Sequence, residues 1–263
     1  MDSAVLEFTS LSQAILSFSV VLPRIAGAFL LLPYFTSEMI PPLVRNVFFV
    51  SVAAVVMPLV LQQPLPPTLA GTALVPILVK ELFIGVSIGF AFGIVFWALE
   101  GAGQVIDTKI GSGAGQLTDP LTGSQTTLIG SYLGRLGAYL FAAFGGLHVF
   151  VDLVLLSYRI WPVLEPLPDL RAVGSLFYIG RFDELMRIVL LIAAPALCIL
   201  TLLEVGLGFV NRYAPQLNVF VLSLALKSWL AILILLLTVG TVVSFVTGWI
   251  AEQRGLLQML PLS

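Results

Sequence analysis

Residues 82–99 read LFIGVSIGFAFGIVFWAL, an eighteen-residue stretch without a charged side chain. A helix of about 20 mostly apolar residues crosses the roughly 30 Å hydrocarbon core of a bilayer. Three further charge-free stretches approach or exceed that length, at residues 47–61, 188–203 and 228–251. The sequence therefore predicts an integral membrane protein.

The composition agrees with a chain covered by lipid or by other protein. Charged residues make up 10% of the 263 residues, against about 25% in an average soluble domain, and hydrophobic residues make up 59%. A soluble enzyme of this composition would expose large apolar patches, and a net charge of −2 with this apolar content also excludes disorder. Because no basic cluster is present, a nucleic-acid partner is not expected.

Apolar stretches bounded by proline, glycine and charge predict an all-α fold with about six apolar helices. The expected helices span residues 8–32, 43–62, 73–99, 128–158, 186–210 and 217–250. Loops are expected at residues 62–67, 101–125 and 159–187. No fixed-period repeat is visible, so one domain over residues 1–263 is the simplest division.

Two of the expected helices carry residues that lipid accommodates poorly. Pro23-Arg24 interrupts the first helix, and Arg135, His148 and Asp152 interrupt the fourth. An ionisable group at mid-bilayer costs at least about 2.5 kcal/mol. We therefore expect these segments to be broken or to form hairpins that face protein or water.

The sequence is poor in residues for catalysis. It has one histidine, His148, and one cysteine, Cys198, so neither a multi-histidine metal site nor an intrachain disulfide can form. The run from Gly111 to Gly115 lacks the lysine and the spacing of a phosphate-binding loop. We expect no catalytic site, no cofactor and no metal.

Glycines and isolated polar residues mark candidate contact surfaces. Gly85, Gly89 and Gly93 recur every four residues, which lets a neighbouring helix approach closely, whether in this chain or in a partner subunit. A second set places polar groups in apolar surroundings, where they hydrogen-bond structurally or line a pathway: Arg24, Glu204, Arg212 and Lys227.

The stretch 101–125 is rich in glycine, serine and threonine. Irregular backbone at membrane depth is tolerated only where protein buries it or where it lines water. Small uncharged side chains could fill a channel and still move. An exposed flexible loop explains the same composition, and both interpretations stay open from composition alone.

Four segments, in this order, carry a family resemblance. They are LPRIAG at residues 22–27 with Pro33, FWALEGAGQVID at 96–107, DPLTGSQ at 119–125, and NRYAPQLNVF at 211–220 followed by Lys227. The chain resembles the T-type export apparatus protein of type III secretion systems, the SctT/FliR family. The FWALE and DPLTG segments are more similar to its injectisome branch than to its flagellar branch.

The resemblance implies a non-enzymatic core component of a type III secretion export gate, which is a helical hetero-oligomer in the bacterial inner membrane. The chain would be a multi-pass subunit within the secretion system base and would form the channel entrance for unfolded protein substrates. The implied partners are R-type and S-type gate subunits, the U-type switch protein, the V-type export protein and membrane lipid. The family's N-terminus lies on the outer side, whereas counting lysine and arginine over six crossings places both termini in the cytoplasm.

In this family a loop of the T-type subunit plugs the closed gate. The matching residues here are Ile110, Gly111, Ser112, Gly113, Ala114, Gly115, Gln116, Leu117, Thr118, Asp119 and Pro120. A secondary transporter of a small solute is the alternative function, because such proteins also combine broken apolar helices with buried charges. A transporter would work alone in liposomes, whereas a gate subunit needs its partners.

Overall fold

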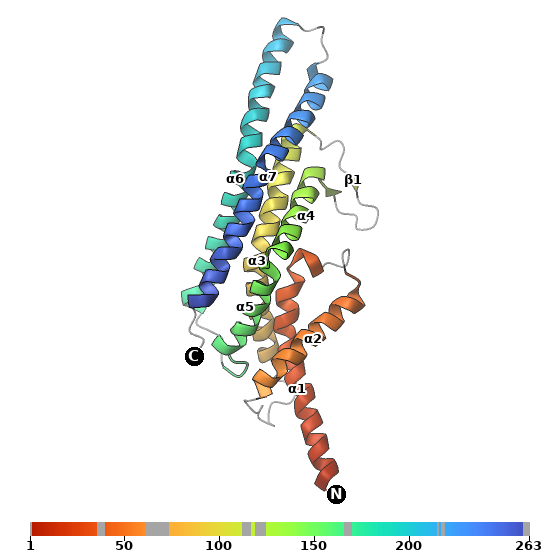
Figure 1. Ribbon diagram of the computed structural model, residues 1–263, viewed down its shortest axis with the longest axis vertical. Helices are drawn as coiled ribbons and strands as arrows, with labels where there is room; N and C mark the ends of the chain where they lie inside the picture. Colours follow the sequence, from red (N-terminus) through yellow and green to blue (C-terminus); the bar gives the residue numbers. More distant parts are fainter. Residues whose placement is uncertain are drawn as a thin grey trace. The chain divides into compact units, whose positions relative to one another are not determined.

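The computed structural model describes residues 2–35, 40–61, 74–111, 117–118, 125–165, 170–214, 216 and 219–259. These residues are almost entirely helical, which confirms the predicted all-α fold (Figure 1). The α-helices are α1 (Asp2–Leu30), α2 (Pro42–Leu61), α3 (Leu74–Ile110), α4 (Leu128–Ala143), α5 (Gly146–Ile160), α6 (Leu170–Tyr213) and α7 (Val219–Met259). A short 3-10 helix, η1 (Pro33–Phe35), follows α1, and the strands β1 (Leu117–Thr118) and β2 (Gln125–Thr126) pair antiparallel.

The chain divides into two compact units. The first comprises Met1–Gly93 and Leu147–Tyr178, and the second comprises Ile94–Gly146 and Ile179–Ser263. Helices α3 and α6 contribute residues to both units. The expectation of one domain over the whole chain stays a prediction.

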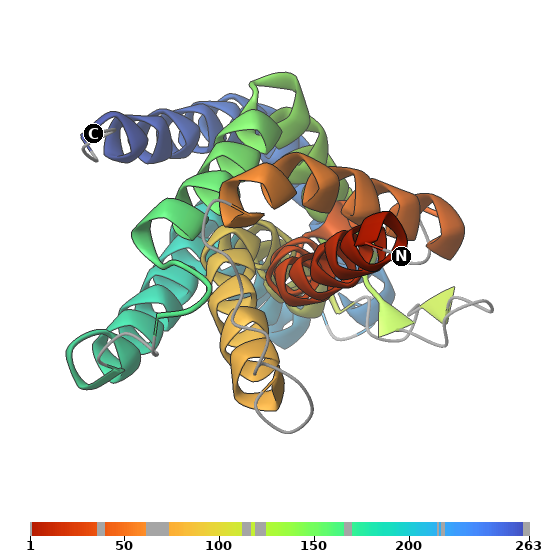
Figure 2. The same cartoon turned by 90° about the horizontal axis from the view of Figure 1, so that it is seen from below.

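Phenylalanine rings form the core of the first unit. Helices α1 and α2 pack against each other there (Figure 2). The fully buried ring of Phe29 has its centroid 5.0 Å from those of Phe35 and Phe150, with edge-to-face geometry. Phe92 of α3 meets Phe150 of α5 at 5.0 Å. These contacts join α1, α3 and α5 around one aromatic core.

The second unit is built on close contacts between α3, α4 and α7. Helix α4 packs against α7. The rings of Phe96 and Phe141 lie 5.1 Å apart, and a Cβ added at Gly103 would lie 2.5 Å from the Cα of Gly130. The glycines therefore let α3 and α4 approach almost backbone to backbone.

Three described helices are long and apolar enough to cross a membrane, within residues 74–110, 177–213 and 221–255. A fourth span results if the bent pair α4 and α5 counts as one. Two shorter apolar helices lie at residues 14–30 and 42–58. The described residues thus contain three or four candidate spans, fewer than the six apolar helices expected from the sequence.

The prediction of a loop at residues 101–125 was wrong over its first ten residues, because α3 continues to Ile110. Glycine lowers helix propensity by about 1 kcal/mol, which argued for a break at Gly101 and Gly103. At Gly103 the lost propensity is offset by the packing against α4 that only glycine permits. The tertiary contact decides the local structure here.

The break expected in the fourth helix is confirmed. It lies between α4 and α5, where Gly145 has φ 78°, a left-handed conformation that glycine adopts without strain. The expected loop at 159–187 is helical from Leu170, since its charges are compatible with an exposed helix and Arg181 pairs with Glu184 one turn later. Mixed charge was mistaken for a loop signal.

Candidate functional sites

The first unit contains a fully buried ion pair between α1 and α3. The side chains of Arg24 and Glu81 are both 0% exposed, and two Arg24 nitrogens bind the two carboxylate oxygens at 2.6 and 2.9 Å. Arg24 also donates to the Ser157 hydroxyl at 3.2 Å and to the Trp161 carbonyl at 2.9 Å. Its guanidinium lies 4.1 Å from the ring centre of Tyr158. One arginine therefore ties α1 to α3 and to the end of α5.

Lys80 completes this buried cluster. Its ammonium lies 3.1 Å from Glu81 and donates to the carbonyls of Pro162, Val163 and Glu165 at 3.2, 2.6 and 2.9 Å. The cluster holds two cations and one anion, so it carries one excess positive charge. The carbonyl oxygens of the turn after α5 are the acceptors that make this burial tolerable.

Helices α1 and α3 cross at the predicted glycines. A Cβ at Gly85 would overlap the backbone of Arg24, and a Cβ at Gly89 would overlap the backbone of Ala28. Gly93 is buried one turn further along α3. The crossing places the backbone of Arg24 against Gly85, so the close approach and the ion pair occur at the same level of the two helices.

In the second unit, Asp107 near the end of α3 caps the beginning of α4. Its carboxylate accepts from the backbone amides of Ile129 and Gly130 at 2.8 and 3.2 Å, and the side chain is almost fully buried. The N-cap residue itself, Thr127, makes no capping hydrogen bond with its side chain. Because the free amides at a helix start favour negative charge, Asp107 holds α4 from outside that helix.

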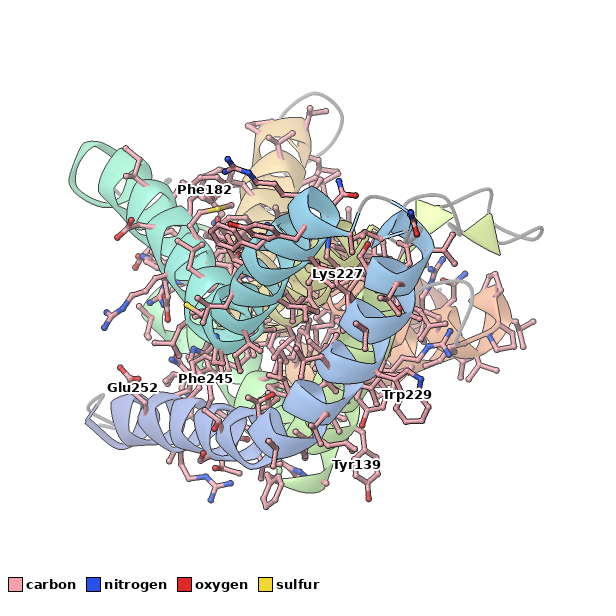
Figure 3. All side chains as sticks on the ribbon, turned by 90° about the horizontal axis from the view of Figure 1, so that it is seen from above. Tyr139, Phe182, Lys227, Trp229, Phe245 and Glu252 are labelled. Atoms are coloured by element: carbon pink, nitrogen blue, oxygen red, sulfur yellow. The ribbon has the colours of Figure 1, made fainter. Side chains whose placement is uncertain are left out.

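Lys109, Glu204 and Lys227 form a second ionic cluster, which joins α3, α6 and α7. Glu204 accepts Lys109 at 2.6 Å and Lys227 at 3.2 Å, one lysine on each carboxylate oxygen. The side chain of Lys227 is 9% exposed, whereas that of Glu204 is 49% exposed. Figure 3 places Lys227 between α6 and α7, and Trp229 on the outer side of α7.

The sequence profile of bacterial export proteins, family 1, matches residues 15–253. The chain belongs to this family. The match covers most of both compact units and includes every residue of the ion pairs in the two clusters.

The individual relatives of this chain are consistent with its membership of the bacterial export family. The chain is 32% identical to "Yop proteins translocation protein T" of Yersinia pestis, over 96% of this chain and 95% of the relative. It is 32% identical to "Surface presentation of antigens protein SpaR" of Salmonella typhimurium, over 81% and 79% of the two chains. The "Flagellar biosynthetic protein FliR" of Bacillus subtilis is more distant, at 26% over 86% and 87%. The injectisome branch is thereby favoured over the flagellar branch.

Membership of the bacterial export family agrees with the resemblance read from the sequence and with a non-enzymatic role. The names of these relatives refer to translocation, to the surface presentation of antigens and to flagellar biosynthesis, and none of them names an enzymatic activity. The apolar helices of this chain identify it as a membrane protein.

The structure pairs two of the four predicted polar residues directly. Glu204 pairs with Lys227, whereas Arg24 lies in the first unit, and Arg212 is exposed in the last turn of α6. Of the predicted plug loop, Ile110 ends α3, Gly111 has φ 89°, and Leu117 and Thr118 form β1. The remaining predicted plug residues, 112–116 and 119–120, lie outside the described residues.

Sequence reasoning missed the partners of these charges. Lys80 and Glu81 stand at the start of the charge-free stretch of α3, and a buried Arg24 requires a carboxylate of this kind. Asp107 and Lys109 were placed in a loop, so neither was expected to pack against α4 or α6. The sequence did contain a signal for these contacts. Two ionisable residues stand on each side of the apolar part of α3, Lys80 and Glu81 before it and Asp107 and Lys109 after it.

Proposed function

We propose that this chain is the T-type core subunit of a type III secretion export gate of the injectisome branch. In this proposal it lies in the bacterial inner membrane and forms the channel entrance for unfolded substrates with R-type and S-type subunits. The U-type switch protein and the V-type export protein associate with the same assembly. The observation that carries the proposal is the family match over residues 15–253, with relatives whose names describe translocation and the surface presentation of antigens.

The surface of the helices supports a subunit role. In the most apolar windows of α6 and α7, only 28% and 22% of the residues are buried within this chain. An apolar surface of this extent has to be covered by lipid or by other subunits. A transporter of a small solute gains no support from the relatives above.

Native mass measurement of the complex that copurifies with the tagged full-length chain tests the assignment. We expect one copy of this chain with several copies of two other small membrane proteins. A chain that purifies as a monomer or as a homo-oligomer from its native membrane would reject the gate assignment.

We further propose that residues 110–120 plug the closed gate. The supporting observation is that the connection between α3 and α4 is fixed at both ends, because Asp107 on α3 binds the first amides of α4. The described residues at the two ends of this segment are thereby held close to each other.

Deletion of residues 112–116 tests the plug. Small-ion leakage through the assembled gate should rise in planar bilayers or in cells. Replacement of the same five residues by alanine and serine keeps the length and serves as the control. An unchanged leak through a deletion complex of normal mass contradicts the plug role.

A further inference from the structure

The end of α3 is tied to its neighbours in the second unit by two charged residues that differ in burial. Asp107, which is 3% exposed, binds the first amides of α4. Lys109, whose side chain is 30% exposed, pairs at 2.6 Å with Glu204 of α6, whose side chain is 49% exposed. Because a buried charged contact costs far more to break than a solvated one, the Lys109 contact is the one that opens readily.

The carboxylate of Glu204 is shared, which lowers the cost of releasing Lys109. Its other oxygen binds Lys227 of α7 at 3.2 Å, and that lysine is 9% exposed and lies between α6 and α7 (Figure 3). Lys227 and Glu204 together are neutral, so Lys109 meets a pair whose charge is already balanced. When Lys109 leaves, its ammonium enters water and the buried lysine keeps its carboxylate. Release therefore leaves no member of the cluster buried without a partner.

The chain leaves α3 at the level of this cluster. Gly111, the residue after α3, has φ 89°, and a Cβ added there would lie 3.3 Å from Cδ2 of Leu224 on α7. Leu224 stands three residues before Lys227, within one turn of α7. The turn of α7 that supplies Lys227 therefore also contacts the point where the chain leaves α3.

We propose that the Lys109–Glu204 contact is a releasable latch on the end of α3. While the contact is formed, it holds the start of the proposed plug, residues 110–120, beside α6 and α7. When substrate displaces the plug, Lys109 leaves Glu204 and the Glu204–Lys227 pair stays in place. This inference rests on the proposed function and adds to it the control of the plug.

The two lysines should have opposite effects on the gate, although both bind one carboxylate. Lys109→Met removes the latch, so small-ion leakage through the assembled gate should rise by about two- to fivefold, the factor that a partly exposed ion pair contributes, while secretion continues. Lys227→Met removes the lysine that repels Lys109 and leaves Glu204 to Lys109 alone. Secretion should then fall by about the same factor, and leakage should not rise.

A cluster that only stabilises the fold would respond in the same direction to both substitutions. Leakage is compared in complexes of wild-type mass. Arg181→Met is the control and should leak like the wild type, because Arg181 forms a partly exposed ion pair with Glu184 and stands 23 positions before Glu204 on the same helix. Wild-type leakage or failed assembly of Lys109→Met overturns the latch, and so does increased leakage of both lysine variants.

Lys109→Arg supplies a test that does not depend on the buried lysine. It keeps the charge at an exposed position and should leak like the wild type, so Lys109→Met and Lys109→Arg decide the question even if Lys227→Met does not assemble. Equal leakage of the two Lys109 variants would show that the charge of Lys109 does not act as a latch.

Deletion of residues 112–116 separates this inference from the proposed plug. A leak that rises on the deletion but not with Lys109→Met rejects the latch and keeps the plug. A leak that stays unchanged on the deletion rejects the plug, and the latch with it.

Discussion

Glu81→Gln should destabilise this chain more than Arg24→Met, although the two residues form one ion pair. The carboxylate of Glu81 lies against both Arg24 and Lys80, and all three side chains are buried. Without that carboxylate, two buried cations face each other. Without Arg24, the remaining pair of Lys80 and Glu81 is neutral and still bonded to three carbonyls.

The expected magnitudes follow from this count of charges. Removing one partner of a buried ion pair costs about 3–5 kcal/mol. We place Arg24→Met at about 3 kcal/mol and Glu81→Gln at about 5 kcal/mol within that range. Each kcal/mol lowers the heat-denaturation midpoint of a chain of this size by about 2–4 °C. The expected shifts are therefore about 6–12 °C and about 10–20 °C.

Heat denaturation of the full-length chain in detergent, followed by tryptophan fluorescence, measures these shifts. Arg24→Lys is the control: it keeps the charge but loses the two-pronged contact, so its midpoint should fall between those of Arg24→Met and the wild type. The double variant Arg24→Met, Glu81→Met should be more stable than Glu81→Gln alone. If Glu81→Gln costs no more than Arg24→Met, the charge count is wrong.

Three further predictions concern glycines and the cap of α4. Gly85→Leu should cost about 1–3 kcal/mol or more, because its side chain would overlap the backbone of α1; Gly180→Leu, at an open position, should change the midpoint little, and equal effects would argue against the crossing. Asp107→Asn should cost about 1–2 kcal/mol and speed hydrogen exchange of the first α4 amides; unchanged exchange would show that the carboxylate charge is not needed. Gly145→Ala should cost about 1–2 kcal/mol because its φ is 78°, whereas Gly240→Ala in open helix should be neutral or stabilising; a neutral Gly145→Ala would contradict the need for glycine at this bend.

The existence of the helices could be predicted from the sequence because long charge-free stretches have few alternatives. Residues 82–99 and 228–251 both lie within continuous helices. Helix ends were less predictable, since they depend on contacts between distant segments. Gly103 remains helical because Gly130 packs against it, and no residue near Gly103 in the sequence indicates that contact.

The pairing of charges was the part that could not be predicted. Arg24 and Glu81 are separated by 57 positions, and Glu204 pairs with two of the three lysines in the chain. A single sequence shows that each charge needs a partner but not which one. The family resemblance supplied the export role, because composition and spacing alone left a transporter equally open.

The carboxylate of Asp107 has a consequence for how the connection after α3 can change. It pins the start of α4 to the end of α3, so the two ends of residues 111–127 keep their separation whatever lies between them. Closing a loop between fixed ends depends only weakly on its length, with about 0.6 kcal/mol for each doubling. Insertions such as a short epitope or a fluorophore-binding peptide can therefore be accommodated there without unfolding α3 or α4, which makes this connection the natural site for a reporter.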